Sequence, residues 1–261
     1  MTLGPLGRLG DWSARHGRPV AVAWVVLLLG LGALAPRAEH ALSGAGWEDS
    51  TSESVQAREL VQRDFAGNSG AALTVVVHSP DLTASDPAFR AAVADAEALL
   101  RADERVASVA GPRPGASISR DGHTALVVAG AAGSTTDMVR AADDLKGPIA
   151  DVGREGVTLS LTGSSGMWSD FNTANKEAML RSEIMSWPVT LGILVLAFGA
   201  LVAAGLPLLL TILGLVATAG SLFLVAQAFD VSIWAMNFAL MFALALGIDY
   251  ALFLVARFRA A

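Results

Sequence analysis

The longest uncharged stretch of the chain covers residues 184–229, 46 positions without Asp, Glu, Lys or Arg. A helix needs about 20 apolar residues to cross the hydrocarbon core of a bilayer. The stretch is therefore too long for one span and suits two spans joined by a tight turn. Because Gly and Pro are the strongest turn signals, Gly205-Leu-Pro207 predicts the break. We expect transmembrane helices over 187–204 and 205–229.

Two further apolar runs predict two more spans, and each follows or precedes a basic segment. Residues 19–35 are uncharged and predict a first transmembrane helix. A secretory signal peptide is the alternative, since Ala33-Leu-Ala35 resembles a cleavage site, but Pro36 directly after it disfavours cleavage. Residues 232–256 predict the fourth helix, with Asp230 marking a short return loop before it.

The positions of the basic residues predict how these spans are oriented. Three Arg precede the first span and two follow the fourth: Arg8, Arg15, Arg18, Arg257 and Arg259. Positive residues favour the cytoplasmic side, and four spans place both ends on one side. We therefore expect residues 1–18 and 257–261 to be cytoplasmic, and residues 36–186 to form an extracytoplasmic domain of a multi-pass protein in the bacterial plasma membrane.

Composition excludes several classes of function. The chain carries a net charge of −6, which argues against nucleic acid as a partner, and has no Cys for disulfides or thiolate ligands. Its four His are scattered without metal-ligand spacing, so we expect neither a metal nor a cofactor. Ser164 and Ser165 lack an arranged His and acid, and we expect no enzymatic activity.

The polar region is predicted to alternate strands and helices. Strands are expected at 73–78, 106–109, 124–129 and 157–162. One helix is expected from Asp86-Pro87 to about residue 101, with Asp86 as its N-cap, and a second, capped by Ser134 or Thr135, to about residue 150. This βαββαβ order is the signature of a ferredoxin-like α+β domain. A further helix is expected at 50–65, capped by Ser50 or Ser52. Gly163-Ser-Ser-Gly166 is expected to be a linker, followed by an amphipathic helix over 167–186 that leads into the second span.

Asp249 is the one acid inside an otherwise apolar run. An Asp at the centre of a membrane helix costs about 2.5–3.5 kcal/mol, so such a residue predicts a functional site. It lies roughly 12 Å along the helix from Arg257 and roughly 25 Å from Ser232. An apolar environment favours the protonated form, and an acid tuned in this way can take up a proton on one side and release it on the other. Tyr250 offers a hydroxyl beside it. The alternative is a structural acid, neutral and hydrogen-bonded to a neighbouring helix.

A stripe of small residues recurs every four positions on the same predicted helix: Ala239, Ala243, Gly247 and Ala251. Small residues at this spacing let another helix approach closely. Asp249 lies about 160° around the helix from Gly247, so we expect the acid and the stripe on different faces.

Two segments resemble the paired signatures of MMPL-type transporters of the resistance–nodulation–division (RND) superfamily: FGALVAAGLPLL at 198–209 and GIDYALFLVARFR at 247–259. The resemblance implies one span, an extracytoplasmic porter domain and then consecutive spans. It implies that Asp249 and Tyr250 form a proton relay and that the protein uses the proton motive force to export lipids or other hydrophobic molecules.

Members of that family usually have two similar halves, each with an Asp-Tyr pair. This chain corresponds to the N-terminal portion, and its expected partners are protons, a lipid or hydrophobic solute, membrane lipids, and either a C-terminal half or an oligomer partner. The alternatives are a non-transporting membrane anchor for a lipid- or partner-binding domain, and an inactive truncated fragment.

Overall fold

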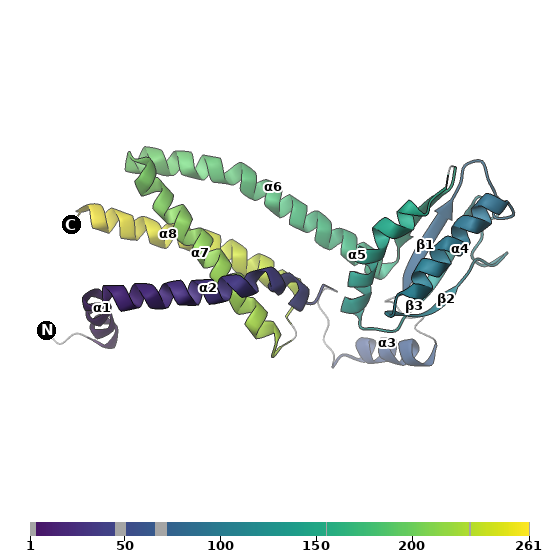
Figure 1. Cartoon of the computed structure of the whole chain (residues 1–261), viewed down its shortest axis with the longest axis horizontal. Coiled ribbons are helices and arrows are strands. Elements are labelled where there is room, and N and C mark those ends of the chain that lie inside the picture. Colours follow the sequence, from purple (N-terminus) through teal and green to yellow (C-terminus); the bar gives the residue numbers. More distant parts are fainter. Residues whose placement is uncertain (1–3, 45–50, 66–71, 155, 230, 261) are drawn as a thin grey trace. The chain divides into compact units, whose positions relative to one another are not determined.

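The computed structural model describes residues 4–44, 51–65, 72–154, 156–229 and 231–260 (Figure 1). The chain forms two compact units. The first, the membrane unit, comprises Met1–Ser43 and Ser182–Ala261, and the second, the polar unit, comprises Gly44–Arg181. Among the described residues, four helices contain a segment long and apolar enough to cross a membrane. They are α2 (Gly17–Ala41), α6 (Ser164–Phe198), α7 (Leu201–Ala226) and α8 (Ile233–Ala260).

The turn between α6 and α7 corrects the sequence prediction. The two helices are separated at Gly199 and Ala200, and the predicted break at Gly205-Leu-Pro207 is wrong because those residues lie inside α7. Gly199 has a φ of 68° and donates its N–H to the carbonyl of Val195 at 2.8 Å. A left-handed Gly of this kind ends a helix, whereas Gly and Pro inside an apolar span are tolerated.

Within the membrane unit, α2 packs closely against α7 and is tied to the start of α8. A Cβ at Gly220 would collide with the backbone of Leu31, and one at Gly32 would lie 3.3 Å from Cγ1 of Val216. Ser43, just after α2, donates its N–H to Val231 at 2.9 Å and accepts from the N–H of Ile233 at 3.0 Å. The predicted marker of this loop, Asp230, lies outside the described residues.

The helix α2 is also longer than the predicted span over 19–35, because it continues through Pro36 to Ala41. The N-terminal region holds an additional helix, α1 (Pro5–Arg15), which the sequence prediction did not include.

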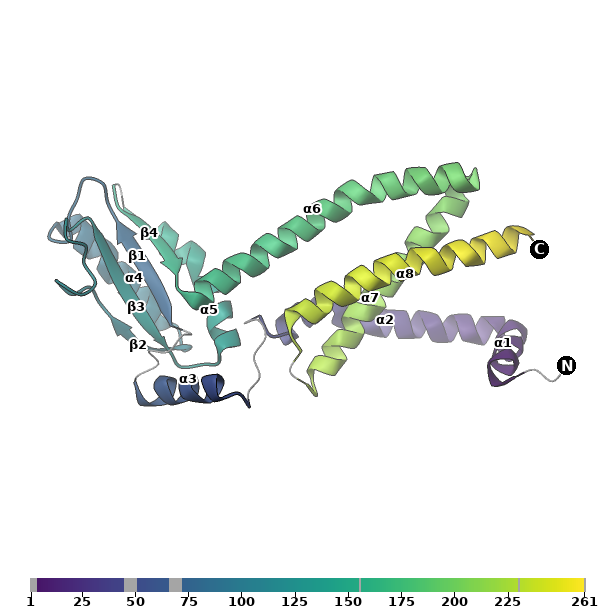
Figure 2. The same ribbon diagram turned by 180° about the vertical axis from the view of Figure 1, so that it is seen from behind.

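The polar unit contains one four-stranded sheet with helices α4 (Pro87–Ala102) and α5 (Thr135–Asp151) on one face (Figure 2). The strands are β1 (Leu73–His78), β2 (Val106–Ala110), β3 (Thr124–Ala131) and β4 (Thr158–Thr162). They are ordered β2-β3-β1-β4, and every neighbouring pair is antiparallel. The predicted strands and helices are therefore present, in the predicted βαββαβ sequence order.

The core of the polar unit follows from the alternation of each strand. In β1, Leu73, Val75 and Val77 are buried, whereas the intervening residues are partly or fully exposed. Successive side chains of a strand point to opposite faces, so these three face the helices. They pack in one cluster with buried side chains of α4 and α5, including Phe89, Leu100, Met138 and Ile149.

Local capping explains where several helices begin. Helix α3 (Glu53–Asp64) starts after Ser52, whose Oγ accepts from the N–H of Val55 at 3.4 Å. Of the two predicted caps, Ser52 is thus confirmed, and Ser50 lies outside the described residues. Ser134 caps α5 in a complete capping box with Asp137. Asp86 occupies the N-cap position of α4, but its carboxylate accepts from Thr83 instead of from the helix.

The predicted Gly/Ser linker at 163–166 is wrong, because α6 begins at Ser164. Gly163 provides the turn before it with a φ of 96°, and a Cβ there would lie 2.8 Å from the carbonyl oxygen of Ala72. Ser169, in the first turns of α6, is buried and donates to Asp143 of α5 at 3.0 Å. The first turns of α6 are therefore packed against α5. The helix then continues without interruption through Trp187 and Pro188, as predicted.

Candidate functional site

Asp249 and Tyr250 lie in α8, the helix that contains the fourth candidate span, Ile233–Tyr250. Both side chains are exposed in the membrane unit, and Tyr250 has 67% of its surface accessible. The helix that carries the predicted relay pair is therefore present, and the pair lies on its outer surface.

The opposite side of α8 makes the close helix–helix contact. A Cβ at Gly247 would lie 3.0 Å from Oγ1 of Thr211 and 3.5 Å from its Cα, so α7 approaches α8 directly over this glycine. Such an approach is what a small residue in a membrane helix permits. Asp249 is about 160° around the helix from Gly247. The exposed acid and the close contact at Gly247 therefore lie on different faces of α8, as expected.

The acid sits within an exposed apolar stripe of α8. Exposed large apolar side chains occur at Met241, Phe242, Leu246 and Phe253. At 100° per residue they fall within about 80° of Asp249 around the helix. The carboxyl group is therefore surrounded on its own helix by side chains that suit lipid or another apolar surface, and not by water-facing residues.

One neighbouring residue of the motif joins α8 to α6. Leu252 is partly buried and packs against a small cluster formed by Leu194, Phe198 and Ala204, from the end of α6 and the start of α7. Since Leu252 lies about 60° from Asp249 on the helix wheel, the acid is at the edge of this contact. A rearrangement of α8 that moved Asp249 would also move Leu252 against α6 and α7.

Three other polar side chains in or next to the spans bond to their own helices. Thr211 donates to the carbonyl of Pro207 at 2.9 Å, and Ser221 donates to Ala217 at 2.8 Å. Gln227 donates to Phe223 at 3.4 Å. These bonds satisfy the side chains without a functional role, as expected for Ser and Thr in apolar helices. Asp249 differs from these three because it is an ionisable group.

Strong electrostatic pairs occur in the polar unit, where they hold loops. Arg105 donates to Asp103 from Nε at 2.8 Å and from Nη2 at 2.6 Å, and to Asp144 at 2.8 Å. The hydrogen bonds from Arg105 hold the pKa of Asp103 below its usual value. Those from the N–H and hydroxyl of Thr83 lower the pKa of Asp86. Both carboxylates close turns next to α4, so their charge has a structural explanation.

No metal or nucleophile site emerges from the residues that the structure describes. They contain no group of three or more His, Asp or Glu side chains placed to hold a metal ion. His78 bonds to Thr124 of β3 at 3.0 Å, and His123 bonds to the carbonyl of Leu82 at 2.8 Å. Ser165 is buried in the first turn of α6.

A known protein family matches the part of the chain that contains α8. Residues 46–261 match the model of the MMPL family. This chain belongs to the MMPL family, within the RND superfamily, and is a multi-pass protein of the plasma membrane.

Three relatives show the breadth of the family. The chain is 33% identical to the membrane protein SCO6666 of Streptomyces coelicolor, over 80% of its own length and 30% of that protein. It is 30% identical to the membrane protein YdfJ of Bacillus subtilis, over 96% of the chain and 34% of YdfJ. It is 27% identical to the mycolic acid-containing lipids exporter MmpL11 of Mycolicibacterium smegmatis, over 97% of the chain and 27% of MmpL11. The chain thus spans about a quarter to a third of the length of these relatives.

Proposed function

We propose that this chain is the N-terminal portion of a transporter that uses the proton motive force to export lipids or other hydrophobic molecules. Asp249 and Tyr250 would form its intramembrane proton relay. Membership of the MMPL family supports transport, and the relative named as an exporter of mycolic acid-containing lipids supports the substrate class. The observation that carries the proposal is the position of Asp249 within an exposed apolar stripe of a candidate span.

The chemistry of the proposed relay follows from the cost of charge in lipid. A protonated carboxyl group is compatible with the apolar stripe, whereas the carboxylate costs about 2.5–3.5 kcal/mol at the centre of a span. Loss of the proton therefore favours a different packing of α8, in which the carboxylate gains a polar partner. The hydroxyl of Tyr250 donates to the carboxylate in this scheme. Proton uptake and release are thereby coupled to movement of α8 against α7.

The exposure of the pair indicates that the working relay includes additional protein. In the membrane unit, the stripe around Asp249 is left uncovered by the described helices. An ionisable side chain in a membrane protein almost always faces the interior of a helix bundle or a water-filled cavity. We therefore propose that further spans cover this face, supplied by a C-terminal half or by an oligomer partner.

The polar unit is proposed to be a ferredoxin-like porter domain on the extracytoplasmic side. The βαββαβ order and the antiparallel strand order β2-β3-β1-β4, with β3 between β1 and β2, support that fold. The basic residues support the orientation, since the first and last segments of the membrane unit carry the Arg residues. The start of α2 and the end of α8 lie at the same end of that unit (Figure 1).

Replacing Asp249 in the full-length protein tests the relay. Asp249→Asn keeps the size of the side chain and its hydrogen-bonding ability but removes the titrating proton. We expect it to abolish export, measured as the loss of surface-extractable lipids from a strain that carries the variant as its sole copy. Asp249→Glu should retain part of the activity. Asp151→Asn, which changes an exposed acid at the end of α5, is the matched control and should export normally.

Membrane abundance of each variant separates a transport defect from a folding defect. If Asp249→Asn reaches the membrane at the level of the original protein and still exports, the relay assignment is wrong. If a strain with the original protein and a deletion strain have the same surface lipids, the anchored lipid- or partner-binding role becomes the better explanation.

A further inference from the structure

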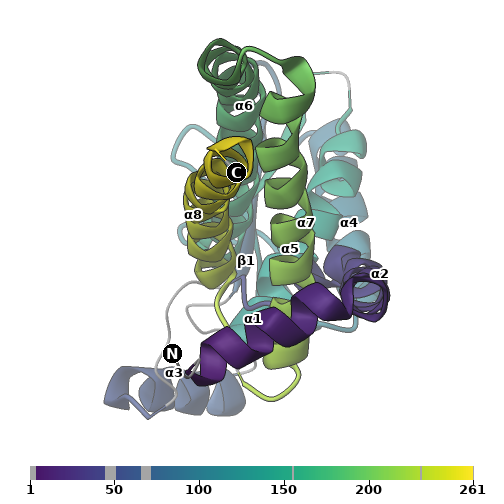
Figure 3. The same ribbon diagram turned by 90° about the vertical axis from the view of Figure 1, so that its left-hand side faces the viewer.

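The N-terminal helix α1 meets the start of α2 at a steep angle. The two helices are separated by His16, whose φ of −111° and ψ of 39° break the helical path. Figures 1 and 3 both show α1 directed away from the axis of α2. If α2 spans the bilayer, α1 therefore lies along the membrane surface, where an amphipathic helix can bury one face among lipids.

The two faces of α1 differ in chemistry. Leu9 and Trp12 lie on one side, with 60% and 51% of their surfaces exposed. Asp11 lies about 160° from Leu9 around the helix and forms an ion pair with Arg15 at 3.0 Å. Arg8 and Arg15 fall within about 60° of Trp12 around the helix, so cationic groups border the apolar side. Residues 1–18 contain three Arg against one acid, a net charge of +2 in a chain whose total is −6.

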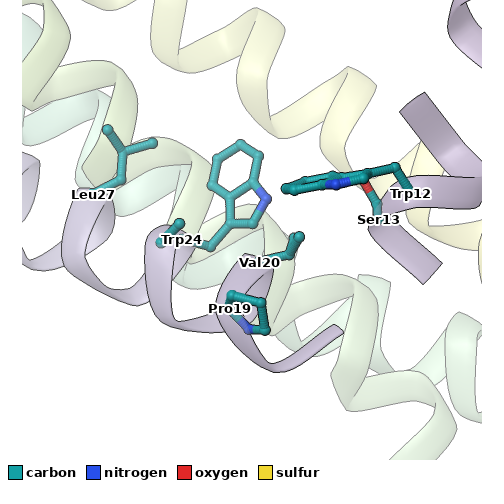
Figure 4. A pocket seen from close by; sticks show the side chains of 7 residues that line it. Trp12, Ser13, Pro19, Val20, Trp24 and Leu27 are labelled. Carbon is teal, nitrogen blue, oxygen red and sulfur yellow. The ribbon is translucent and has the colours of Figure 1, made fainter. Parts of the chain in front are cut away.

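A groove runs between α1 and the first turns of α2 (Figure 4). Its volume is about 400 Å³, within the range of ligand pockets. It is lined by Trp12 and Ser13 of α1 and by a single face of α2: Pro19, Val20, Ala23, Trp24 and Leu27. From Pro19 to Leu27 the helix rises roughly 12 Å, so the groove extends along α2 from its N-terminal end, which is expected on the cytoplasmic side.

The groove is continuous with the apolar surface of α2. Adjacent side chains on that helix, among them Val22, Val25 and Val26, are exposed. A phospholipid that lies beside α2 can therefore place an acyl chain between Trp12 and Trp24 without leaving the bilayer. The Arg residues at the border of α1 are then positioned at the level of the headgroup, where indole rings are also favoured.

We infer that the groove between α1 and α2 binds an anionic phospholipid of the cytoplasmic leaflet. One acyl chain occupies the groove, and the phosphate interacts with Arg8, Arg15 and Arg18. Charge complementarity favours an anionic lipid over a zwitterionic one, because the basic segment attracts the negative surface of that leaflet. The continuity of the groove with α2 favours a bilayer lipid over a soluble ligand. This inference does not depend on the proposed transport activity.

The absence of Cys from the chain permits a site-specific test of how α1 meets the membrane. Leu9→Cys and Ala14→Cys introduce single labelling sites about 140° apart on α1. Each full-length variant is labelled with an environment-sensitive fluorophore and reconstituted in nanodiscs of dioleoyl phosphatidylcholine with dioleoyl phosphatidylglycerol. We expect the label at position 9 to be blue-shifted and quenched by brominated acyl chains, and the label at position 14 to remain in water. Equal emission at both positions would overturn the inference.

Native mass spectrometry of the purified full-length chain tests the lipid preference. We expect dioleoyl phosphatidylglycerol to be retained in preference to dioleoyl phosphatidylcholine. Arg8→Gln and Arg18→Gln should each weaken retention of the anionic lipid about fivefold, the effect of about 1 kcal/mol per charge near a membrane surface. Trp12→Ala should weaken retention of both lipids by removing one wall of the groove.

Arg257→Gln is the matched control, since it removes a charge expected on the same side of the membrane but outside α1. It should leave retention nearly unchanged. An equal loss from Arg257→Gln and Arg18→Gln would show a general attraction to the basic end of the protein and would overturn the groove as the binding site. Retention without headgroup preference, or binding of a second copy of the chain at this face instead of lipid, would overturn it as well.

Discussion

The two units of the molecule use the same apolar residue types in opposite ways. In the polar unit, Leu73, Phe89 and Ile149 are fully buried between the sheet and its helices. In the membrane unit, Val22, Leu196 and Val202 lie on the outside, and the buried hydrophobic cluster there is small. Lipid therefore removes the need for an internal apolar core, since lipid tails solvate such side chains as well as a core does.

The source of cohesion differs accordingly. The polar unit combines its core with ion pairs such as that between Arg105 and Asp103. The described helices of the membrane unit instead approach one another closely at glycines, with Gly220 against Leu31 and Gly247 against Thr211. Van der Waals packing of this kind is the main attraction available between helices in lipid.

Removal of side-chain volume should have the largest effect in the polar unit. Leu100→Ala creates a cavity next to fully buried neighbours, and we expect a loss of about 2–5 kcal/mol in the free energy of unfolding. Leu196→Ala in α6, where 86% of the side chain is exposed, should change stability little. Hydrogen exchange of the full chain in detergent, followed separately for peptides of each unit, measures both. Equal losses would contradict the contrast between a buried core and a lipid-facing surface.

Within the membrane unit, addition of a single methyl group should destabilise the protein where two helices touch and should be neutral where they do not. Gly220→Ala places a Cβ against the backbone of Leu31, and we expect overpacking to cost about 1–3 kcal/mol. Gly214→Ala, on the same helix, places its Cβ in open space and should be neutral. Thermal denaturation in detergent compares the two variants. A neutral Gly220→Ala would show that close approach between α2 and α7 is not required.

Acid should destabilise the polar unit through its paired carboxylates, by the smallest of these effects. Because the folded state lowers the pKa of Asp103, its contribution to stability is complete above the unfolded value of about 3.9 and is lost as the pH falls below it. Asp103→Asn should therefore reduce stability at pH 6 and make the decline between pH 4 and 3 shallower.

The matched control for this acid effect is Asp151→Asn, on the exposed end of α5. It should leave the pH profile unchanged in circular dichroism melts of the full chain. The same decline in Asp103→Asn as in the original protein would assign the acid sensitivity to other groups.

The sequence predicted most of the polar unit because its signals are local. The run of β-branched residues at 73–78 and the Ser134 cap depend on neighbouring residues alone, and both are present in the structure. Asp86 occupies the predicted N-cap position of α4, but its carboxylate accepts from Thr83, three residues before it, and not from the helix. The residue type at the cap position therefore does not determine which donor its side chain accepts from.

The membrane unit was harder to predict in detail. Gly199 and Gly205 both precede apolar residues, and only the left-handed backbone at Gly199 identifies the true turn. For the candidate site, helical spacing predicted that Asp249 and Gly247 occupy different faces of α8. It could not name Thr211 as the contact of Gly247, because that pairing depends on how two distant helices meet. The helix α1 was missed, although Leu9 and Trp12 recur at helical spacing and Asp11 falls about 160° from Leu9.

The backbone hydrogen bonds of Ser43 with Val231 and Ile233 have a consequence for biosynthesis. Ser43 joins Val231 and Ile233 across about 190 residues of intervening chain. At roughly 5–20 residues per second, a ribosome needs roughly 10–40 s to make that length. The first span must therefore remain in the bilayer for that time before its partner residues are made. The polar unit is complete once Arg181 has emerged, so it can already be folded when the fourth span arrives.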